Sequence, residues 1–215
     1  MAAEDSFVYP ELGGGDAFRL VHLQPCENLE SSVECSLENT KLADYRHDIA
    51  DHYIAISYVW GDPTDRRTIM IDGKRLEITA SLESALRHIR DPRRILQVWA
   101  DGICIDQNDV LDRNQQVSLM GDIYSTAEHT IIFLGLSSPR CDAMLQWMSL
   151  GADSSESEGT PYPLTCQFEM VVEDEILARP WFTRVWILQE LVLSRIHGFS
   201  ADDIESGGEY FTEQS

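Results

Sequence analysis

Stretches with strand character alternate with stretches of helical character along this chain, and this alternation most limits the folds open to it. Residues 53–60 (YIAISYVW), 95–100 and 130–134 are short, apolar and rich in β-branched or aromatic residues, as in buried strands. Residues 79–90 and 112–128 instead place apolar side chains at helical spacing. Thr79 or Ser81 can cap the first of these helices, whose apolar face holds Leu82, Ala85, Leu86 and Ile89, and Asp72–Gly73 before it predicts a hairpin turn. Strands that alternate with helices predict an α/β fold with a mainly parallel central sheet flanked by helices.

The ends of the chain differ in composition from its middle. With 215 residues the chain suits one domain, which we place at residues 18–200. Residues 18–23 (FRLVHL) predict an extra N-terminal strand. We expect residues 1–17 to form a flexible leader, about 137–177 a helical insertion with a polar stretch, and 201–215 an acidic tail.

The charge of the chain restricts its partners. Sixteen basic residues against 37 acidic ones give a net charge of −21, which disfavours nucleic acids and anionic membranes as partners. A small anionic ligand can still bind where local hydrogen-bond donors outweigh the repulsion from this net negative charge. No apolar run approaches the roughly 20 residues that span a bilayer, and the acidic N-terminus does not resemble a signal peptide. We therefore expect a cytoplasmic protein.

Polar and aromatic residues follow the strand at 53–60. Ser57, Tyr58, Trp60 and Gly61 lie at its end, and Arg66 comes shortly after. In a parallel sheet, ligands bind beyond the carboxyl ends of the strands, where the loops 61–67, 101–109 and 135–139 are expected. Gly61 permits a close backbone approach, and arginine can bind phosphate oxygens in a bidentate way. The alternative is an ordinary turn with a packed tryptophan and solvated arginines.

Two carboxylates, Asp101 and Asp106, and two amides follow the strand at 95–100. They suit an acid/base site or a site for ribose hydroxyls. Equally, they can cap loose backbone N–H groups ahead of the next helix. Cys104 lies between two isoleucines and is expected to be a small buried hydrophobe rather than a nucleophile. No sequence motif for a zinc site is present.

One acidic residue stands out in the apolar stretch 179–193, which predicts a buried helix entered through a proline. On such a helix Glu190 shares a narrow sector with Thr183 and Ser194, flanked by Trp186. A carboxylate in apolar surroundings needs a strong partner or a function. The structural alternative is an ion pair with one of three arginines, Arg184, Arg179 or Arg113.

Four ordered blocks of this chain resemble the fungal heterokaryon incompatibility (HET) domain. They are residues 53–61 (YIAISYVWG), 98–107 (VWADGICIDQ), 113–127 and 179–190 (RPWFTRVWILQE), and residues 18–23 resemble the family's first strand. The chain departs from the family at Asp106, usually asparagine, and at Asp112, commonly glutamate. The resemblance implies an effector of fungal non-self recognition that triggers programmed cell death.

A weaker resemblance links the chain to Toll-interleukin receptor (TIR) domains, several of which cleave NAD+. It rests on Ser57 and Tyr58 at the end of a core strand and on Trp186 four residues before Glu190. The resemblance implies a TIR-like fold and NAD+ glycohydrolase activity with Glu190 as the catalytic residue, NAD+ being a substrate, with no bound cofactor or metal. Glu190 would face the positive charge that develops on the ribose. The alternative is a non-enzymatic adaptor that self-associates or recruits a regulatory protein.

Within this hypothesis the other candidates contact the substrate. Trp60 or Trp186 would stack on a ring, while the amides around Gly61 and the guanidinium of Arg66 or Arg67 would offset the phosphates. The remaining substrate-binding candidates are Ser57, Tyr58, Asp101 and Asp106.

Overall fold

The computed structural model describes residues 5–46, 52–143, 172–184, 190 and 197–200. Three sequence predictions lie wholly or largely outside these ranges: the site residue Trp186, the acidic tail and most of the insertion at 137–177.

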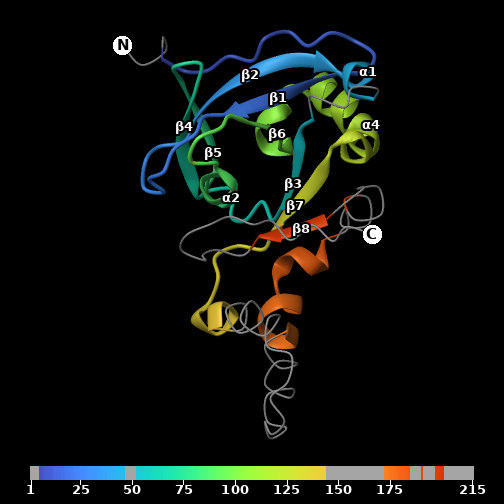
Figure 1. The fold of residues 1–215 in the computed structure, drawn as a ribbon. Helices are drawn as coiled ribbons and strands as arrows, with labels where there is room; N and C mark the ends of the chain where they lie inside the picture. The colour runs from blue at the N-terminus through green and yellow to red at the C-terminus, as the bar shows by residue number, and fades with distance from the viewer. Residues whose placement is uncertain (1–4, 47–51, 144–171, 185–189, 191–196, 201–215) are drawn as a thin grey trace, which may run out of the picture.

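A single mixed β-sheet organises the described chain (Figure 1). Its eight strands run in the order β5-β4-β2-β1-β6-β3-β7-β8. Their bounds are β1 Ala17–Leu23, β2 Glu34–Lys41, β3 Ile54–Tyr58, β4 Arg66–Ile71, β5 Lys74–Thr79, β6 Leu96–Trp99, β7 His129–Phe133 and β8 His197–Ser200.

The sheet has a parallel half and a mixed half. Strands β6, β3, β7 and β8 pair in parallel, whereas β1 is antiparallel to β2 and β6, and β4 is antiparallel to β5. The α/β class is confirmed, but the sheet is mixed rather than mainly parallel. The lengths of the connections cause this difference. The two-residue turn Asp72–Gly73 joins β4 to β5 and makes them antiparallel, because parallel neighbours need a crossover of about a dozen residues or more.

Helices connect and cover the strands. They are α1 Leu42–Tyr45, α2 Ala80–Ile89, α3 Asp101–Cys104 and α4 Val110–Thr126, with a π-helical turn η1 Val172–Leu177 and a 3₁₀ turn η2 Pro180–Thr183. In Figure 1, α2 and α4 lie on either side of the descending strands β3 and β7. No helix in the described part of the chain is both long and apolar enough to cross a membrane.

Local sequence explains where α2 begins and which face it buries. The Thr79 hydroxyl accepts a hydrogen bond from the Leu82 amide, which is the N-cap arrangement expected for this residue. The buried face of α2 includes the four apolar residues that the sequence placed on one side of the helix, Leu82, Ala85, Leu86 and Ile89. This helix was therefore predicted correctly in extent and orientation.

The main core lies between the central strands and helices α2, α3 and α4. Its largest fully buried side chains include Phe18, Tyr53, Tyr58 and Trp99. A second, smaller hydrophobic cluster lies beside β7, in the parallel half of the sheet. Here the fully buried Trp181 packs with Ile132 and Leu134, among others. This second cluster fixes the turn η2 against the end of the parallel half of the sheet.

The continuous helix predicted over 179–193 is wrong in its first part. Residues Pro180–Thr183 form a 3₁₀ turn, and Arg184 after them has an extended backbone with φ −77° and ψ 143°. Burial of Trp181 and the side-chain contacts of Arg184 outweigh helical propensity here. The helical sector expected to join Thr183 and Glu190 therefore does not exist.

Residues 5–16, expected to be part of a flexible leader, lie along the domain and contact it. The Phe7 amide donates to the Arg75 carbonyl at 2.8 Å, and the Tyr9 hydroxyl donates to the Ile103 carbonyl at 2.9 Å. The division into leader, domain and tail stays a prediction, but this segment does not stand apart from the sheet.

Helix α4 offers a test of local stability. The exposed Asp109 caps it by accepting hydrogen bonds from the amides of Leu111 and Asp112, at 2.8 and 3.4 Å. Asp109→Ala should lower the free energy of unfolding by about 1 kcal/mol in urea denaturation, because both bonds are lost. Asp109→Asn keeps an equivalent cap and serves as the control; an equal loss in both variants would contradict a role of the cap.

Candidate functional site

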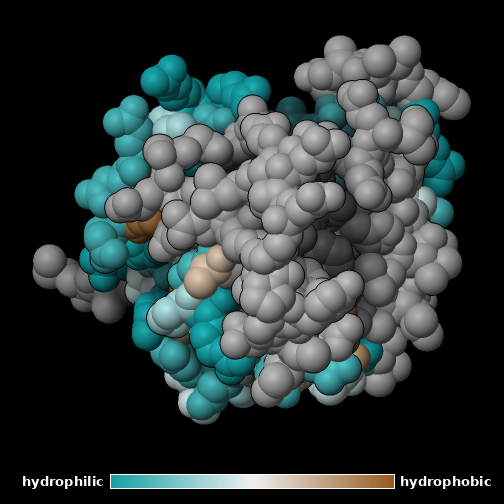
Figure 2. Space-filling model, turned by 60° about the horizontal axis from the view of Figure 1, so that its bottom comes forward, coloured by the Kyte–Doolittle hydropathy of each residue, from teal (hydrophilic) through white to brown (hydrophobic). Residues whose placement is uncertain are grey.

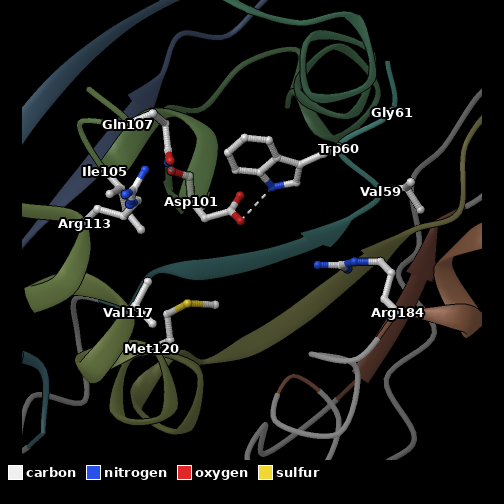
Figure 3. A pocket seen from close by; sticks show the side chains of 10 residues that line it. All are labelled: Val59, Trp60, Gly61, Asp101, Ile105, Gln107, Arg113, Val117, Met120 and Arg184. Carbon is white, nitrogen blue, oxygen red and sulfur yellow. Dashed lines mark hydrogen bonds between the residues drawn. The ribbon is translucent and has the colours of Figure 1, made fainter. Parts of the chain in front are cut away.

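A pocket of about 460 Å³ opens at the carboxyl ends of the parallel strands β3 and β6 (Figure 3). Two of the three predicted loops contribute to it, those following β3 and β6, whereas the loop at 135–139 does not. The lining residues are Val59, Trp60, Gly61, Asp101, Ile105, Gln107, Arg113, Val117, Met120 and Arg184.

Trp60 and Asp101 join the two loops. The Trp60 indole N–H donates to Oδ2 of Asp101 at 2.8 Å, drawn as the dashed line in Figure 3. Gly61, with φ +72°, turns the chain away directly after the tryptophan, which few other residues could do. The indole is therefore held at the mouth of the pocket, where 37% of Trp60 stays exposed for a ring to stack on.

The Asp101 carboxylate lies in a poorly solvated position. Part of the residue is open, but its Oδ1 atom is buried. Burial raises the pKa of Asp101 above its ordinary value, although the hydrogen bond from Trp60, the Tyr58 hydroxyl and the Arg184 charge act in the opposite direction. Asp101 is thus a carboxylate in a low-dielectric site, able to accept hydrogen bonds from hydroxyl groups of a ligand.

The close approach of α3 to Tyr58 depends on Gly102. A Cβ atom at this position would lie 2.5 Å from the Tyr58 hydroxyl oxygen and 2.8 Å from Cδ2 of Leu82. Tyr58 is fully buried, and burial, reinforced by the Asp101 charge, raises the pKa of its phenol well above the ordinary value. Tyr58 is therefore a buried, neutral phenol behind Asp101, and it does not line the pocket.

The lining of the pocket carries more positive than negative charge. Arg113 from α4 and Arg184 after η2 approach from opposite sides in Figure 3, and Asp101 is the acidic residue among the ten. Gln107 is held by its own hydrogen bond, in which Nε2 donates to the Asp101 carbonyl at 2.8 Å. In a chain of net charge −21, these two guanidinium groups supply the local donors that an anionic ligand requires.

Glu190 lies in a buried cluster beside the pocket. Its two carboxylate oxygens accept from Nη1 and Nη2 of Arg184 at 3.0 and 2.9 Å, a bidentate pair. The Ser57 hydroxyl donates to Oε2 of Glu190 and itself accepts from Nε1 of Trp181 at 2.6 Å. Glu190 is 2% exposed, whereas the Arg184 side chain is 19% exposed. Arg184 therefore both lines the pocket and pairs with the buried Glu190.

This arrangement matches the structural alternative that the sequence left open for Glu190, an ion pair with Arg184. Glu190 is not among the ten residues that line the pocket. Its catalytic role stays a prediction, and that role would require Arg184 to move from the carboxylate.

Two predicted site residues, Arg66 and Asp106, do not line the pocket, and each makes a local hydrogen bond instead. Arg66 is exposed on β4, and its Nη2 donates to the Glu77 carbonyl at 2.7 Å across the hairpin. The Asp106 carboxylate accepts from the Asn108 amide at 3.0 Å, the capping role named as its alternative.

The cysteine beside this loop is an inert part of the core. Cys104 is fully buried, and burial raises the pKa of its thiol to about 12. The expectation of a small buried hydrophobe is confirmed.

Three lining residues in the two loops, Val59, Ile105 and Gln107, were not site candidates of the sequence. Four more, outside these loops, were also missed: Arg113, Val117, Met120 and Arg184. The first three of these four recur at intervals of four and three residues on α4, so they share one helix face, which is a readable signal. Arg184 carried no such signal, because the sequence placed it within a helix over 179–193, whereas the 3₁₀ turn ends at Thr183 and Arg184 has an extended backbone.

Fold and site together define an α/β protein with a ligand-sized pocket at the carboxyl edge of parallel strands. The family model described as heterokaryon incompatibility protein (HET) matches residues 53–190, and the chain belongs to this family. The chain is 29% identical over 240 aligned positions to "Heterokaryon incompatibility protein 6, OR allele" of Neurospora crassa, covering 90% of this chain and 35% of that protein. It thus spans about a third of that relative. No solved structure matches, so the resemblance to TIR domains stays a prediction.

Proposed function

We propose that this HET domain acts in fungal heterokaryon incompatibility as a cytoplasmic effector of cell death, and that its pocket binds and hydrolyses NAD+. The observation that carries the proposal is the pocket itself, where Trp60, Asp101 and two arginines converge beside the buried Glu190. Its volume of about 460 Å³ lies within the range usual for small-molecule sites.

Each lining group suits one part of a dinucleotide. The partly exposed Trp60 indole can stack on a base or on the nicotinamide ring. The guanidinium groups of Arg113 and Arg184 can bind the pyrophosphate oxygens in a bidentate way. Asp101 can accept hydrogen bonds from ribose hydroxyls, as buried carboxylates do in nucleotide sites.

The reaction breaks the bond between the nicotinamide nitrogen and C1′ of the ribose. Nicotinamide leaves as a neutral group with the bonding electrons, a water oxygen adds to C1′, and the water gives up one proton to solvent. Positive charge develops on the ribose ring before water attacks, and a nearby carboxylate stabilises it. Glu190 is the candidate for this role, once Arg184 no longer occupies its carboxylate.

A second candidate function rests on the Glu190–Arg184 pair. A carboxylate neutralised by a bidentate guanidinium suits a structural role, as expected for an adaptor that self-associates or recruits a regulatory protein. On the face seen in Figure 2, the described part of the surface is mostly hydrophilic with only small separate hydrophobic areas, so the described residues on this face offer an adaptor no broad apolar contact surface.

Release of nicotinamide from NAD+ tests the proposal directly. Wild-type protein should release nicotinamide, and Glu190→Gln should reduce the rate by about 100-fold or more, because the charge facing the ribose is removed. Asp109→Asn, which removes one exposed carboxylate outside the pocket, is the charge-matched control and should keep the wild-type rate. Equal release by wild type and Glu190→Gln would exclude Glu190, and no release at concentrations that allow self-association would favour the adaptor.

A further inference from the structure

Arg184 is the residue that the pocket and the buried Glu190 cluster have in common. It lines the pocket, and it also holds both carboxylate oxygens of Glu190. In Figure 3 its side chain reaches toward the space between Trp60 and Met120. A group bound in the pocket therefore meets the same guanidinium that neutralises Glu190.

The two partners of the ion pair differ in their freedom to move. Glu190 is almost completely buried and is also held by the Ser57 hydroxyl, which Trp181 fixes in turn. The Arg184 side chain is partly exposed and sits on an extended backbone just after a 3₁₀ turn. If the pair separates, Arg184 is the partner that moves, and the Ser57 hydroxyl stays bound to the carboxylate.

We propose that Arg184 exchanges partners when ligand binds: phosphate oxygens in the pocket pair with its guanidinium and draw it away from Glu190. Phosphate presents the same bidentate acceptor geometry as a carboxylate, so the exchange replaces one charge-assisted pair by another. This proposal rests on the pocket accepting a phosphate-bearing ligand, as in the proposed function. The exchange moves the Arg184 guanidinium away from the Glu190 carboxylate only in the presence of substrate.

Charge balance gives the exchange a preference for NAD+. A buried carboxylate that loses its cation is strongly destabilised unless another positive group replaces it. The nicotinamide ring of NAD+ carries such a charge, and the ribose acquires one as the bond breaks. A zwitterionic ligand therefore supplies an anion for Arg184 and a cation for Glu190 at the same time.

Titration with inorganic pyrophosphate, followed by isothermal calorimetry, tests the exchange without any turnover. In wild-type protein, pyrophosphate competes with Glu190 for Arg184, and this competition weakens its apparent affinity. Glu190→Gln removes the competing charge, so it should bind pyrophosphate about tenfold more tightly than wild type. Asp109→Asn also removes one negative charge and should bind like wild type, which separates the exchange from a general change in net charge.

The outcomes separate this proposal from the proposed function. Equal or weaker binding by Glu190→Gln, with measurable binding by wild type, would overturn the exchange and leave a phosphate-binding pocket. Absence of binding in every variant would overturn both the exchange and the nucleotide pocket. A variant that is merely damaged would lose affinity, so a gain cannot come from partial unfolding.

A second measurement keeps the test independent of the folding of Glu190→Gln. In wild-type protein the side-chain ¹⁵Nε signal of Arg184, identified by its absence in Arg184→Lys, should shift on addition of pyrophosphate and saturate along the calorimetric binding curve. Binding without a shift of this signal would overturn the exchange.

Discussion

Replacing Arg19 with methionine should lower the free energy of unfolding by about 3–5 kcal/mol, because it leaves the buried Asp112 carboxylate without its cation. Arg19 is 2% exposed and Asp112 is 7% exposed, and their side chains meet at 2.7 Å. Arg19 also donates to the carbonyls of Cys104 and Pro10, both at 3.1 Å. The substitution thus disconnects β1 from the end of α3, from the first turn of α4 and from the N-terminal segment at Pro10. Chemical denaturation followed by far-UV circular dichroism measures the loss.

An exposed ion pair provides the matched control for this prediction. Arg46 and Asp122 are more than half exposed at their side chains and lie 3.4 Å apart, so Arg46→Met should cost less than about 1 kcal/mol. The double variant Arg19→Met/Asp112→Leu should recover part of the loss, since no buried charge is left alone. Recovery would be incomplete, because the amide of Asp106 loses its acceptor on Asp112. A small effect of Arg19→Met would show that this pair does not hold the N-terminal strand in place.

The parts of the fold that depend on local patterns could be predicted from the sequence. The Asp72–Gly73 turn, the Thr79 cap and the apolar face of α2 each need only neighbouring residues, and each lies where it was expected. Strand order could not be predicted in this way. The antiparallel pairing of β1 with β6 joins residues far apart in sequence, and no residue of either strand specifies a direction.

The site could be predicted where it depends on the ends of strands and not where it depends on tertiary contacts. Trp60, Gly61 and Asp101 line the pocket because β3 and β6 are parallel and adjacent, which the alternating pattern favoured. Arg184 was named as a partner for Glu190 but not as a pocket residue, because the extended backbone at this residue follows from packing of Trp181, and propensity alone favours a helix there.

Trp181→Ala should destabilise the domain by about 3–5 kcal/mol, the second of the largest effects expected. Trp181 is fully buried, and its ring fills the second cluster beside Ile132 and Leu134. The truncation also removes the indole N–H that donates to the Ser57 hydroxyl at 2.6 Å. Denaturation curves measured with and without ADP-ribose would report both the loss of stability and any loss of ligand binding.

Trp181→Phe separates packing from hydrogen bonding in the same position. It retains an aromatic ring in the cluster but offers no donor to Ser57, so it should cost only about 1–2 kcal/mol. If the indole N–H orients Ser57 toward Glu190, nicotinamide release should fall in Trp181→Phe even under conditions where the variant is fully folded. If release stays at the wild-type rate, Trp181 acts through packing alone, and the orientation of the Ser57 hydroxyl is set by Glu190 and Arg184.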